Sequence, residues 1–292
     1  MDQATNKCRY CSMYLSYEMG KSIIYECPRQ AVTERGFCEF HDPDYWREHE
    51  EEVRSKFEEM IKSAQENNEK LLCIGFNLPS VTVKGEFKKP VYFFDVKFHN
   101  TADFFNAKFY QKAYFFNTEF HQLAIFLTAK FYQKADFSFV KFYHEAHFSH
   151  AEFYHIADFS SAKFYQKADF HHAKFYHEAY FHLAAFNGRT EFIGTRLIFS
   201  TDDYTKDKGI YDSLKHISFM GARFLKPSEV FFDHVYLGRV SFINCDIERV
   251  NFRNVIWRKE RSGRYVIFDE ELLAIKANQK LREELEQRGL KE

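Results

Sequence analysis

The chain has few glycines and no long apolar segment. Glycine accounts for 11 of its 292 residues, and no apolar run approaches the roughly 18–20 residues that a membrane span requires. The amino terminus has no apolar stretch of the kind found in a secretory signal. The formal net charge is −1 at pH 7, which gives no electrostatic reason to expect nucleic acid or an acidic membrane as a partner. We therefore expect a cytoplasmic protein without a membrane span.

Signatures of catalysis are also missing from the sequence. It contains no nucleophile–base motif, no glycine-rich phosphate loop and no pair of acidic residues isolated in an apolar setting. We therefore predict that the protein is not an enzyme.

Aromatic side chains, in contrast, are abundant, with 36 Phe and 18 Tyr. Between residues 87 and 192, Phe recurs at steps that alternate between six and five, so the true period is eleven residues. A small residue, usually Ala, stands two positions before most of them. The recurring residues are Phe87, Phe93, Phe98, Phe104, Phe109, Phe115, Phe120, Phe126, Phe131, Phe137, Phe142, Phe148, Phe153, Phe159, Phe164, Phe170, Phe175, Phe181, Phe186 and Phe192.

Helix and long strand both fail to explain this period. An eleven-residue repeat can drive a right-handed coiled coil, but steps of five and six would place successive Phe about 140° apart around a helix and leave no apolar stripe. In a long strand, a five-residue step would send the next Phe to the opposite face. A very short strand followed by a bend in every unit satisfies the pattern, because the small residue and the Phe then both point inward.

Several units match a known motif: a small residue, a polar residue, Leu or Phe, and two variable residues. Full matches are Ala135-Asp136-Phe137-Ser138-Phe139, Ala157-Asp158-Phe159-Ser160-Ser161 and Ala168-Asp169-Phe170-His171-His172. In these units the chain resembles the pentapeptide-repeat family, in a Phe-rich variant, over roughly residues 85–257. The resemblance implies a mainly β fold, a right-handed quadrilateral β-helix with one repeat per side. Since every second unit carries one extra residue, we expect about 22 residues per coil instead of twenty, with an altered shape at two corners.

Stacking at this repeat length predicts the surface. Residues 22 apart should lie one layer apart, roughly 4.8 Å. Tyr110, Tyr132, Tyr154 and Tyr176 are therefore expected to form a ladder, as are the pairs Tyr143 and Tyr165, His150 and His172, and His155 and His177. These columns either shield the Phe-packed corners or offer a flat aromatic docking surface.

The first 41 residues contain five candidate ligands for a structural zinc ion: Cys8, Cys11, Cys27, Cys38 and His41. Cys8-x2-Cys11 and Cys38-x2-His41 have the spacing of chelating knuckles. Zinc takes four ligands, so one candidate is spare, and the spacing favours keeping Cys11. The alternative is a set of free intracellular thiols, because a disulfide is not expected without secretion.

The family resemblance favours a different spare residue. Phe-rich relatives carry a Cys, then Cys-Pro, then Cys-x-x-His followed by Asp-Pro, and this chain matches at Cys8, Cys27-Pro28, Cys38, His41 and Asp42-Pro43. The resemblance thus implies that Cys11 is the spare, whereas the spacing implies the opposite. Either way, a fully protein-ligated site would be structural.

The chain divides into four parts. We expect a Cys/His module over residues 1–41, a linking helix over 42–72 capped by Asp42, a β-helix over 81–257, and a C-terminal helix within 265–292. Residues 71–90 are predicted to form an irregular entry, and 200–216 a polar excursion. The C-terminal helix either plugs the open end of the β-helix or pairs with a second copy in a homodimer.

Two functions compete at this point. A convex prism of stacked polar residues encloses no pocket, which favours a non-enzymatic scaffold that presents a rigid face to an unknown protein partner. The alternative, implied by the resemblance, is a DNA mimic that inhibits type II topoisomerases. Mimicry requires a strongly acidic surface, whereas Lys108, Lys130, Lys141, Lys163 and Lys174 occupy outward columns. A nucleic-acid-related role is therefore the weaker expectation.

Overall fold

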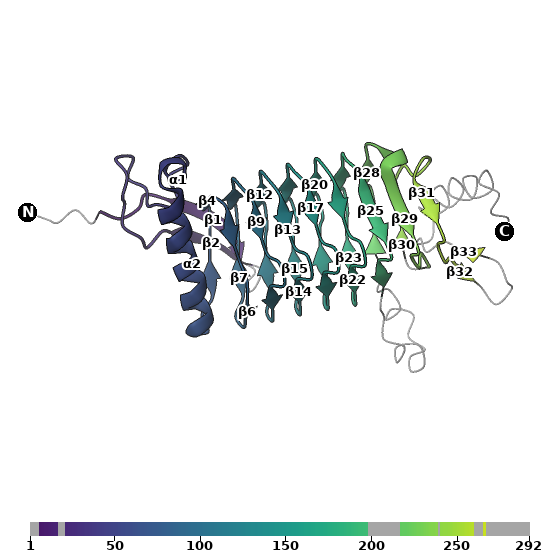
Figure 1. Cartoon of the computed structure of the whole chain (residues 1–292), viewed down its shortest axis with the longest axis horizontal. Helices are drawn as coiled ribbons and strands as arrows, with labels where there is room; N and C mark the ends of the chain where they lie inside the picture. Colours follow the sequence, from purple (N-terminus) through teal and green to yellow (C-terminus); the bar gives the residue numbers. More distant parts are fainter. Residues whose placement is uncertain (1–5, 17–20, 198–216, 239, 260–264, 267–292) are drawn as a thin grey trace, which may run out of the picture.

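The computed structural model describes residues 6–16, 21–197, 217–238, 240–259 and 265–266. These residues form a β-solenoid whose coils follow one another along the longest axis of the molecule, with an antiparallel hairpin and two α-helices at its N-terminal end (Figure 1). The predicted β-helix is confirmed. Among the described residues, no helix combines the length and hydrophobicity needed to cross a bilayer.

The solenoid has four faces, each a stack of short parallel strands. Face 1 contains β3 (Leu71–Leu72), β7 (Val91–Tyr92), β11 (Ala113–Tyr114), β15 (Ala135–Asp136), β19 (Ala157–Asp158), β23 (Ala179–Tyr180), β27 (Ile217–Ser218) and β30 (Val240–Ser241). Face 2 contains β4 (Asn77–Leu78), β8 (Lys97–Phe98), β12 (Glu119–Phe120), β16 (Lys141–Phe142), β20 (Lys163–Phe164), β24 (Ala185–Phe186) and β28 (Arg223–Phe224). From β3 to β29 (Val230–Asp233), successive strands of the chain move from one face to the next, so each complete coil visits all four faces.

The other two faces have the same construction. Face 3 contains β5 (Val81–Thr82), β9 (Ala102–Asp103), β13 (Ala124–Ile125), β17 (Ala146–His147), β21 (Ala168–Asp169), β25 (Thr190–Ile193), β29 (Val230–Asp233) and β31 (Asn251–Arg253). Face 4 contains β6 (Glu86–Phe87), β10 (Lys108–Phe109), β14 (Lys130–Phe131), β18 (Glu152–Phe153), β22 (Lys174–Phe175) and β26 (Arg196–Leu197). A short 3₁₀ helix, Pro227–Glu229, precedes β29, and β32 (Arg258–Lys259) pairs antiparallel with β33 (Tyr265–Val266).

Strand register gives the predicted repeat length. Phe109 lies opposite Phe131, and Phe131 opposite Phe153, each a step of 22 residues. Backbone hydrogen bonds run between layers, as from the amide of Phe126 to the carbonyl oxygen of His147 at 2.7 Å. The coil therefore satisfies its backbone groups by pairing with the next coil, as buried peptide groups require.

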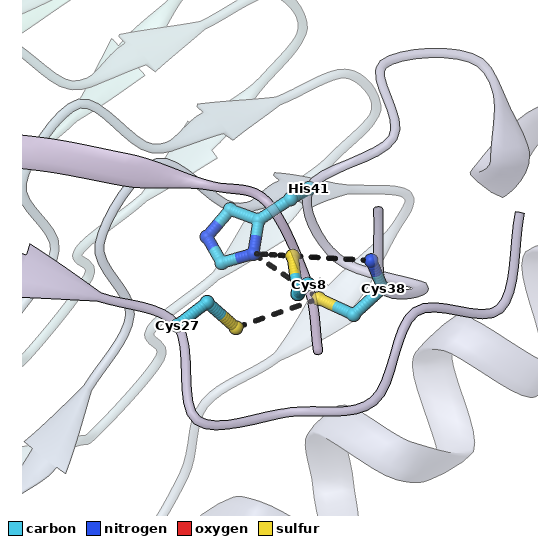
Figure 2. A group of neighbouring side chains, drawn as sticks. All are labelled: Cys8, Cys27, Cys38 and His41. Carbon is cyan, nitrogen blue, oxygen red and sulfur yellow. Dashed lines mark hydrogen bonds between the residues drawn. The ribbon is translucent and has the colours of Figure 1, made fainter. Parts of the chain in front are cut away.

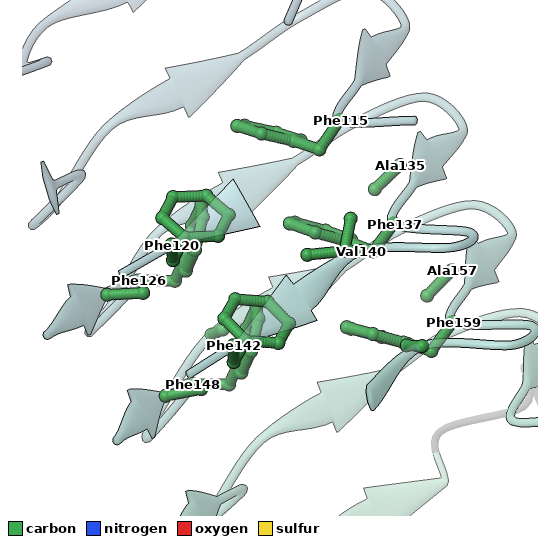
Figure 3. Packing of buried hydrophobic residues seen from close by; sticks show 14 of the residues in the cluster. Phe115, Phe120, Phe126, Ala135, Phe137, Val140, Phe142, Phe148, Ala157 and Phe159 are labelled. Atoms are coloured by element: carbon green, nitrogen blue, oxygen red, sulfur yellow. The ribbon is translucent and has the colours of Figure 1, made fainter. Parts of the chain in front are cut away.

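Four columns of Phe fill the interior, and Figure 3 shows a part of this packing. Rings of the same column stack in parallel, for example Phe115 on Phe137 with centroids 4.7 Å apart, while neighbouring columns meet edge to face, as Phe126 meets Phe137 at 89°. Both arrangements suit the quadrupole of aromatic rings. The inward assignment of the Phe repeat is confirmed, since the side chains of this repeat are almost wholly buried.

The two kinds of corner differ in backbone conformation. At the five-residue steps, the second residue after Phe takes a positive φ, and this recurs every eleven residues from Asp95 to Leu183. Such a left-handed residue closes a tight turn. At the six-residue steps the extra residue lengthens the corner instead, and no residue described there has a positive φ. The altered shape predicted from the sequence thus lies at the six-residue corners.

The predicted irregular entry over residues 71–90 is wrong. The structure has strands β3, β4, β5 and β6 there, and they pair with the strands of the second coil. Leu71, Leu78 and Val81 occupy inward positions that Phe and Ala hold in later coils. Of the repeating Phe residues the first coil carries only Phe87, in β6, so the repeat alone does not reveal its first three strands.

Two helices follow the Cys/His module. The carboxylate of Asp42 accepts the backbone N–H of Tyr45, where α1 (Tyr45–Glu48) begins. The helical conformation is interrupted at His49, and α2 (Glu50–Glu66) begins at the next residue. The predicted helix over 42–72 is thus shorter and divided in two. The buried side chains of α2 include Val53, Phe57 and Ile61, and α2 contacts β3, β5 and β6, so it covers the first coil (Figure 1).

The predicted outer columns are present. Tyr110, Tyr132, Tyr154 and Tyr176, here called the tyrosine ladder, stack with centroids 4.7, 4.8 and 4.5 Å apart. Of the predicted His pairs, His155 and His177 stack in parallel at 4.7 Å, and His150 and His172 lie 5.0 Å apart with a tilt of 34°.

Two predicted segments cannot be compared with the structure. The polar excursion over residues 200–216 and the C-terminal helix with its roles as plug or dimer contact lie outside the described residues.

Candidate metal centre

A hairpin and a tight turn bring the predicted ligands together. Strand β1 (Cys11–Ser16) pairs antiparallel with β2 (Lys21–Glu26), which places Cys8, just before β1, beside the residues that follow β2. The amide of Cys8 donates to Arg29 and that of Cys27 to Tyr10, which holds the two cysteines in register. A turn then follows Cys38, whose carbonyl oxygen accepts the amide of His41.

Cys8, Cys27, Cys38 and His41 form one buried group (Figure 2). Their four ligand atoms all lie within 4.8 Å of one another. Nδ1 of His41 is 3.1 Å from Sγ of Cys38 and 3.5 Å from Sγ of Cys8, and the sulfurs of Cys27 and Cys38 are 3.8 Å apart. Three sulfurs and one imidazole nitrogen that converge in this way could hold a metal ion.

One hydrogen bond and two aromatic contacts fix the ring of His41. Its Nε2 lies 2.8 Å from the carbonyl oxygen of Ile74, which can only accept, so Nε2 carries the proton and Nδ1 is left as an acceptor. Tyr10 stacks on the ring with centroids 3.8 Å apart, and Phe76 meets it edge-on at 5.2 Å. A backbone partner of this kind is the usual way in which proteins orient a metal-binding histidine.

The thiols of Cys27 and Cys38 form a close pair, with their sulfurs 3.8 Å apart. A hydrogen bond with Cys38 lowers the pKa of Cys27 to about 4, against the opposing effect of burial. The same contact, together with burial, raises the pKa of Cys38. A bound cation would favour loss of the protons from both sulfurs, because metal ligation needs deprotonated sulfur.

Cys11 lies apart from this group. It is exposed at the start of β1, whereas the other four candidates are buried together. The spacing of Cys8-x2-Cys11 therefore does not produce a knuckle here, because the chain enters an extended strand at Cys11 instead of turning. The arrangement follows the ligand pattern that the family resemblance implies.

Sequence reasoning missed a second group of metal-ligating side chains. Asp169, His171 and Glu191 bring three ligand atoms within 4.8 Å of one another on face 3. The 22-residue repeat places Glu191 one layer above Asp169, and His171 follows Asp169 by two positions. This spacing was sufficient to find the group, since residues i, i+2 and i+22 converge on one face of such a solenoid.

Comparison with known proteins gives one match. A family model described as pentapeptide repeats (9 copies) matches residues 148–196. Searches of curated proteins and of solved structures found no match.

Proposed function

From the premise that the solenoid of this chain is a pentapeptide-repeat domain, we propose that the protein is a non-enzymatic scaffold that docks a protein partner on a rigid aromatic face. The observation that carries this proposal is the tyrosine ladder, whose rings stack at 4.5–4.8 Å along the six-residue corner between face 4 and face 1. An ordered surface of this kind loses little conformational entropy on binding, which favours association.

Charged side chains hold the ladder in place. Glu152 contacts Lys130 at 3.1 Å, Lys174 at 2.7 Å and the hydroxyl of Tyr154 at 2.6 Å, so three layers are joined through one carboxylate. Burial and the hydrogen bond to Glu152 raise the pKa of Tyr154, so its hydroxyl remains a hydrogen-bond donor to Glu152. Tyrosine suits protein interfaces because it combines a large apolar ring with a polar tip.

A structural zinc site is the second part of the proposal. Burial, the converging sulfurs and the fixed tautomer of His41 support Cys8, Cys27, Cys38 and His41 as ligands of one Zn²⁺. Four protein ligands leave no open position for a substrate, so the ion would stabilise the module and take no part in chemistry. The cysteines described in the structure are all free thiols, which fits a reducing, cytoplasmic location.

A comparison of one variant in the tyrosine ladder with one in the Tyr143–Tyr165 stack tests the scaffold proposal. The full chain is immobilised and used to capture a partner from an extract of the source cells, in the wild type and in Tyr132→Ser and Tyr165→Ser. We expect Tyr132→Ser to lose the captured protein and Tyr165→Ser, on the opposite corner, to keep it. Recovery of no specific partner, or equal recovery with both variants at unchanged melting temperature, would contradict the proposal.

The DNA-mimic alternative is not favoured by the charges on face 2. Lys141 is neutralised by Glu119 at 2.8 Å, whereas Lys97 and Lys163 on the same face form no ion pair with another described residue. A surplus of cations opposes mimicry of a polyanion. We expect the full chain to leave the supercoiling activity of a type II topoisomerase unchanged. Inhibition of this activity would favour the DNA mimic over the scaffold.

A further inference from the structure

The group on face 3 has the chemistry of a metal site that is independent of the Cys/His module. Asp169 in β21 and Glu191 in β25 are register partners in adjacent layers, and the ring of His171 lies beside both carboxylates. Nδ1 of His171 lies 3.0 Å from Oδ1 of Asp169 and 3.6 Å from Oε2 of Glu191. The side chains of both acids are nine-tenths or nearly nine-tenths buried, with exposed fractions of 11% and 5%.

These distances suit a small divalent ion. A metal about 2.0–2.2 Å from each ligand atom would see ligand pairs at such separations under angles of roughly 90–120°. The remaining coordination positions would face solvent, because the side chain of His171 is one-third exposed. One imidazole with two carboxylates is a set that binds first-row divalent ions such as Zn²⁺ and Co²⁺.

Lys167 and Arg189 already balance the charges of the two carboxylates, so a metal ion must displace one of these cations. Oε2 of Glu191 is shielded from solvent, and its close partner is Nζ of Lys167, which lies 2.8 Å away as an ion pair. Nδ1 of His171 and the two carboxylate oxygens are all acceptors when the ring proton is on Nε2. Three acceptors that face one another need either a proton on Nδ1 or a metal ion between them.

We propose that Asp169, His171 and Glu191 form a second, solvent-open binding site for a first-row divalent metal ion on face 3. Lys167 competes with the metal for Oε2 of Glu191, and its Nζ also lies 3.2 Å from Oδ2, the other carboxylate oxygen of Asp169. Its side chain is partly exposed and can swing into solvent when the ion enters. Arg189 stays bound to the other oxygen of Glu191, Oε1, at 2.6 Å and keeps that carboxylate in place.

Lys167 provides a test that separates a metal site from an ion-paired cluster without a metal function. Removal of a ligand must weaken metal binding, whereas removal of Lys167 must strengthen it, because the ammonium no longer repels the ion or occupies its ligands. An ion-paired cluster without a metal function predicts no binding in either case. The sign of the Lys167 effect therefore separates the two interpretations.

The experiment is a calorimetric titration of the full chain with Co²⁺, after addition of one equivalent of Zn²⁺ to fill the thiolate group. Near-ultraviolet spectra report whether sulfur ligates the cobalt, so this test does not depend on the Cys/His site. We expect one equivalent to bind without a sulfur charge-transfer band. His171→Gln should weaken this binding at least about tenfold, and Lys167→Ala should strengthen it about tenfold.

His147→Gln is the matched control, because His147 lies one layer below Asp169 on the same face and pairs with Glu145 at 2.9 Å. Its cobalt affinity should equal that of the wild type. Absence of a binding event at millimolar Co²⁺, or wild-type affinity in Lys167→Ala, would overturn the proposal. The Lys167 variant keeps the test decisive if His171→Gln fails to fold.

Discussion

Nε2 of His41 donates a hydrogen bond to the carbonyl oxygen of Ile74, with 2.8 Å between the two atoms. One candidate metal ligand is thus bonded directly to the backbone of the first coil. A second bond joins the same parts, from the amide of Asn77 to the carbonyl oxygen of Phe40 at 2.7 Å. The Cys/His module and the start of the solenoid therefore form one cooperative unit, and disturbance of the module should reach the first coil.

Metal removal should loosen the N-terminal end of the solenoid and leave its middle intact. With a strong chelator, we expect the amide of Asn77 to exchange faster, because Phe40 loses its fixed position when the module unfolds. The amide of Phe126, bonded to His147 at 2.7 Å in the middle of the solenoid, should keep its protection. Native-state hydrogen exchange measures both amides, and equal protection of Asn77 with and without chelator would show that no metal supports the module.

Substitution of single cysteines should identify the ligands. We expect Cys8→Ser to reduce bound zinc from one equivalent to a small fraction, since one ligand of four is lost, and to lower the melting temperature. Cys11→Ser should retain one equivalent, because Cys11 is exposed outside the group. Metal analysis of both variants, purified side by side, gives the answer, and zinc loss in Cys11→Ser would restore the ligand pair suggested by spacing.

The candidate site could be predicted only in part from the sequence. Residue types and the Cys38-x2-His41 turn were readable, because short-range spacing controls a turn. Whether Cys11 joined them depended on the path of the chain after Cys8, and that path is set by the pairing of β1 with β2 over a longer range. The partner of His41 could not be predicted, since Ile74 is distant in sequence and belongs to a coil that the Phe period does not mark.

A buried Phe should be far more costly to truncate than an exposed Phe of the same repeat. Phe131 stacks between Phe109 and Phe153 with centroids 4.9 Å from each, and it is almost wholly buried. Phe131→Ala should therefore destabilise the protein by about 3–5 kcal/mol. Phe139 is 51% exposed, and Phe139→Ala is the control, with an expected change below about 1 kcal/mol. Chemical denaturation measures both, and similar losses for the two variants would contradict the inward assignment.

Replacement of a leucine in a left-handed corner should stabilise the solenoid. Leu183 has a φ of 55° and is 65% exposed, so it gains little burial for its strained backbone. Asn tolerates this conformation better, and Leu183→Asn should raise the free energy of unfolding by roughly 0.5–1 kcal/mol. Leu123 lies at a corner without positive φ, so Leu123→Asn should give no gain. A lower melting temperature for Leu183→Asn than for the wild type would show that its side-chain contacts outweigh the strain.

Strand register and stacking could be predicted from the sequence more fully than the backbone conformation at the corners. Because strand register repeats every 22 residues, the sequence alone placed Tyr132 on Tyr110 and His177 on His155, and the structure confirms both stacks. Backbone conformation at the corners was not readable, since positive φ falls on residues as different as Asn117 and Phe139. There the pairing between layers overrides the local preference of the residue.

Acidification should weaken the contact between α1 and the second coil through His99. The ring of His99 lies between Trp46, at 4.4 Å, and His121, at 5.3 Å, and its Nε2 is 3.1 Å from Oδ1 of Asn77. Burial, assisted by the positive charges of His121, Lys97 and Arg47, lowers the pKa of His99 to about 4. The folded protein therefore keeps this histidine neutral at a pH at which the unfolded chain already binds a proton.

The sign of the pH effect follows from this difference. Between the unfolded pKa of about 6.5 and the folded value of about 4, the unfolded state holds more protons, so stability falls as the pH falls through this window. The slope cannot exceed about 1.4 kcal/mol per pH unit, because a single histidine exchanges at most one proton between the folded and unfolded states. In His99→Gln, whose amide can still bond Asn77, the melting temperature should depend less on pH between 6.5 and 4. Parallel curves for wild type and variant would show that His99 does not contribute to acid sensitivity.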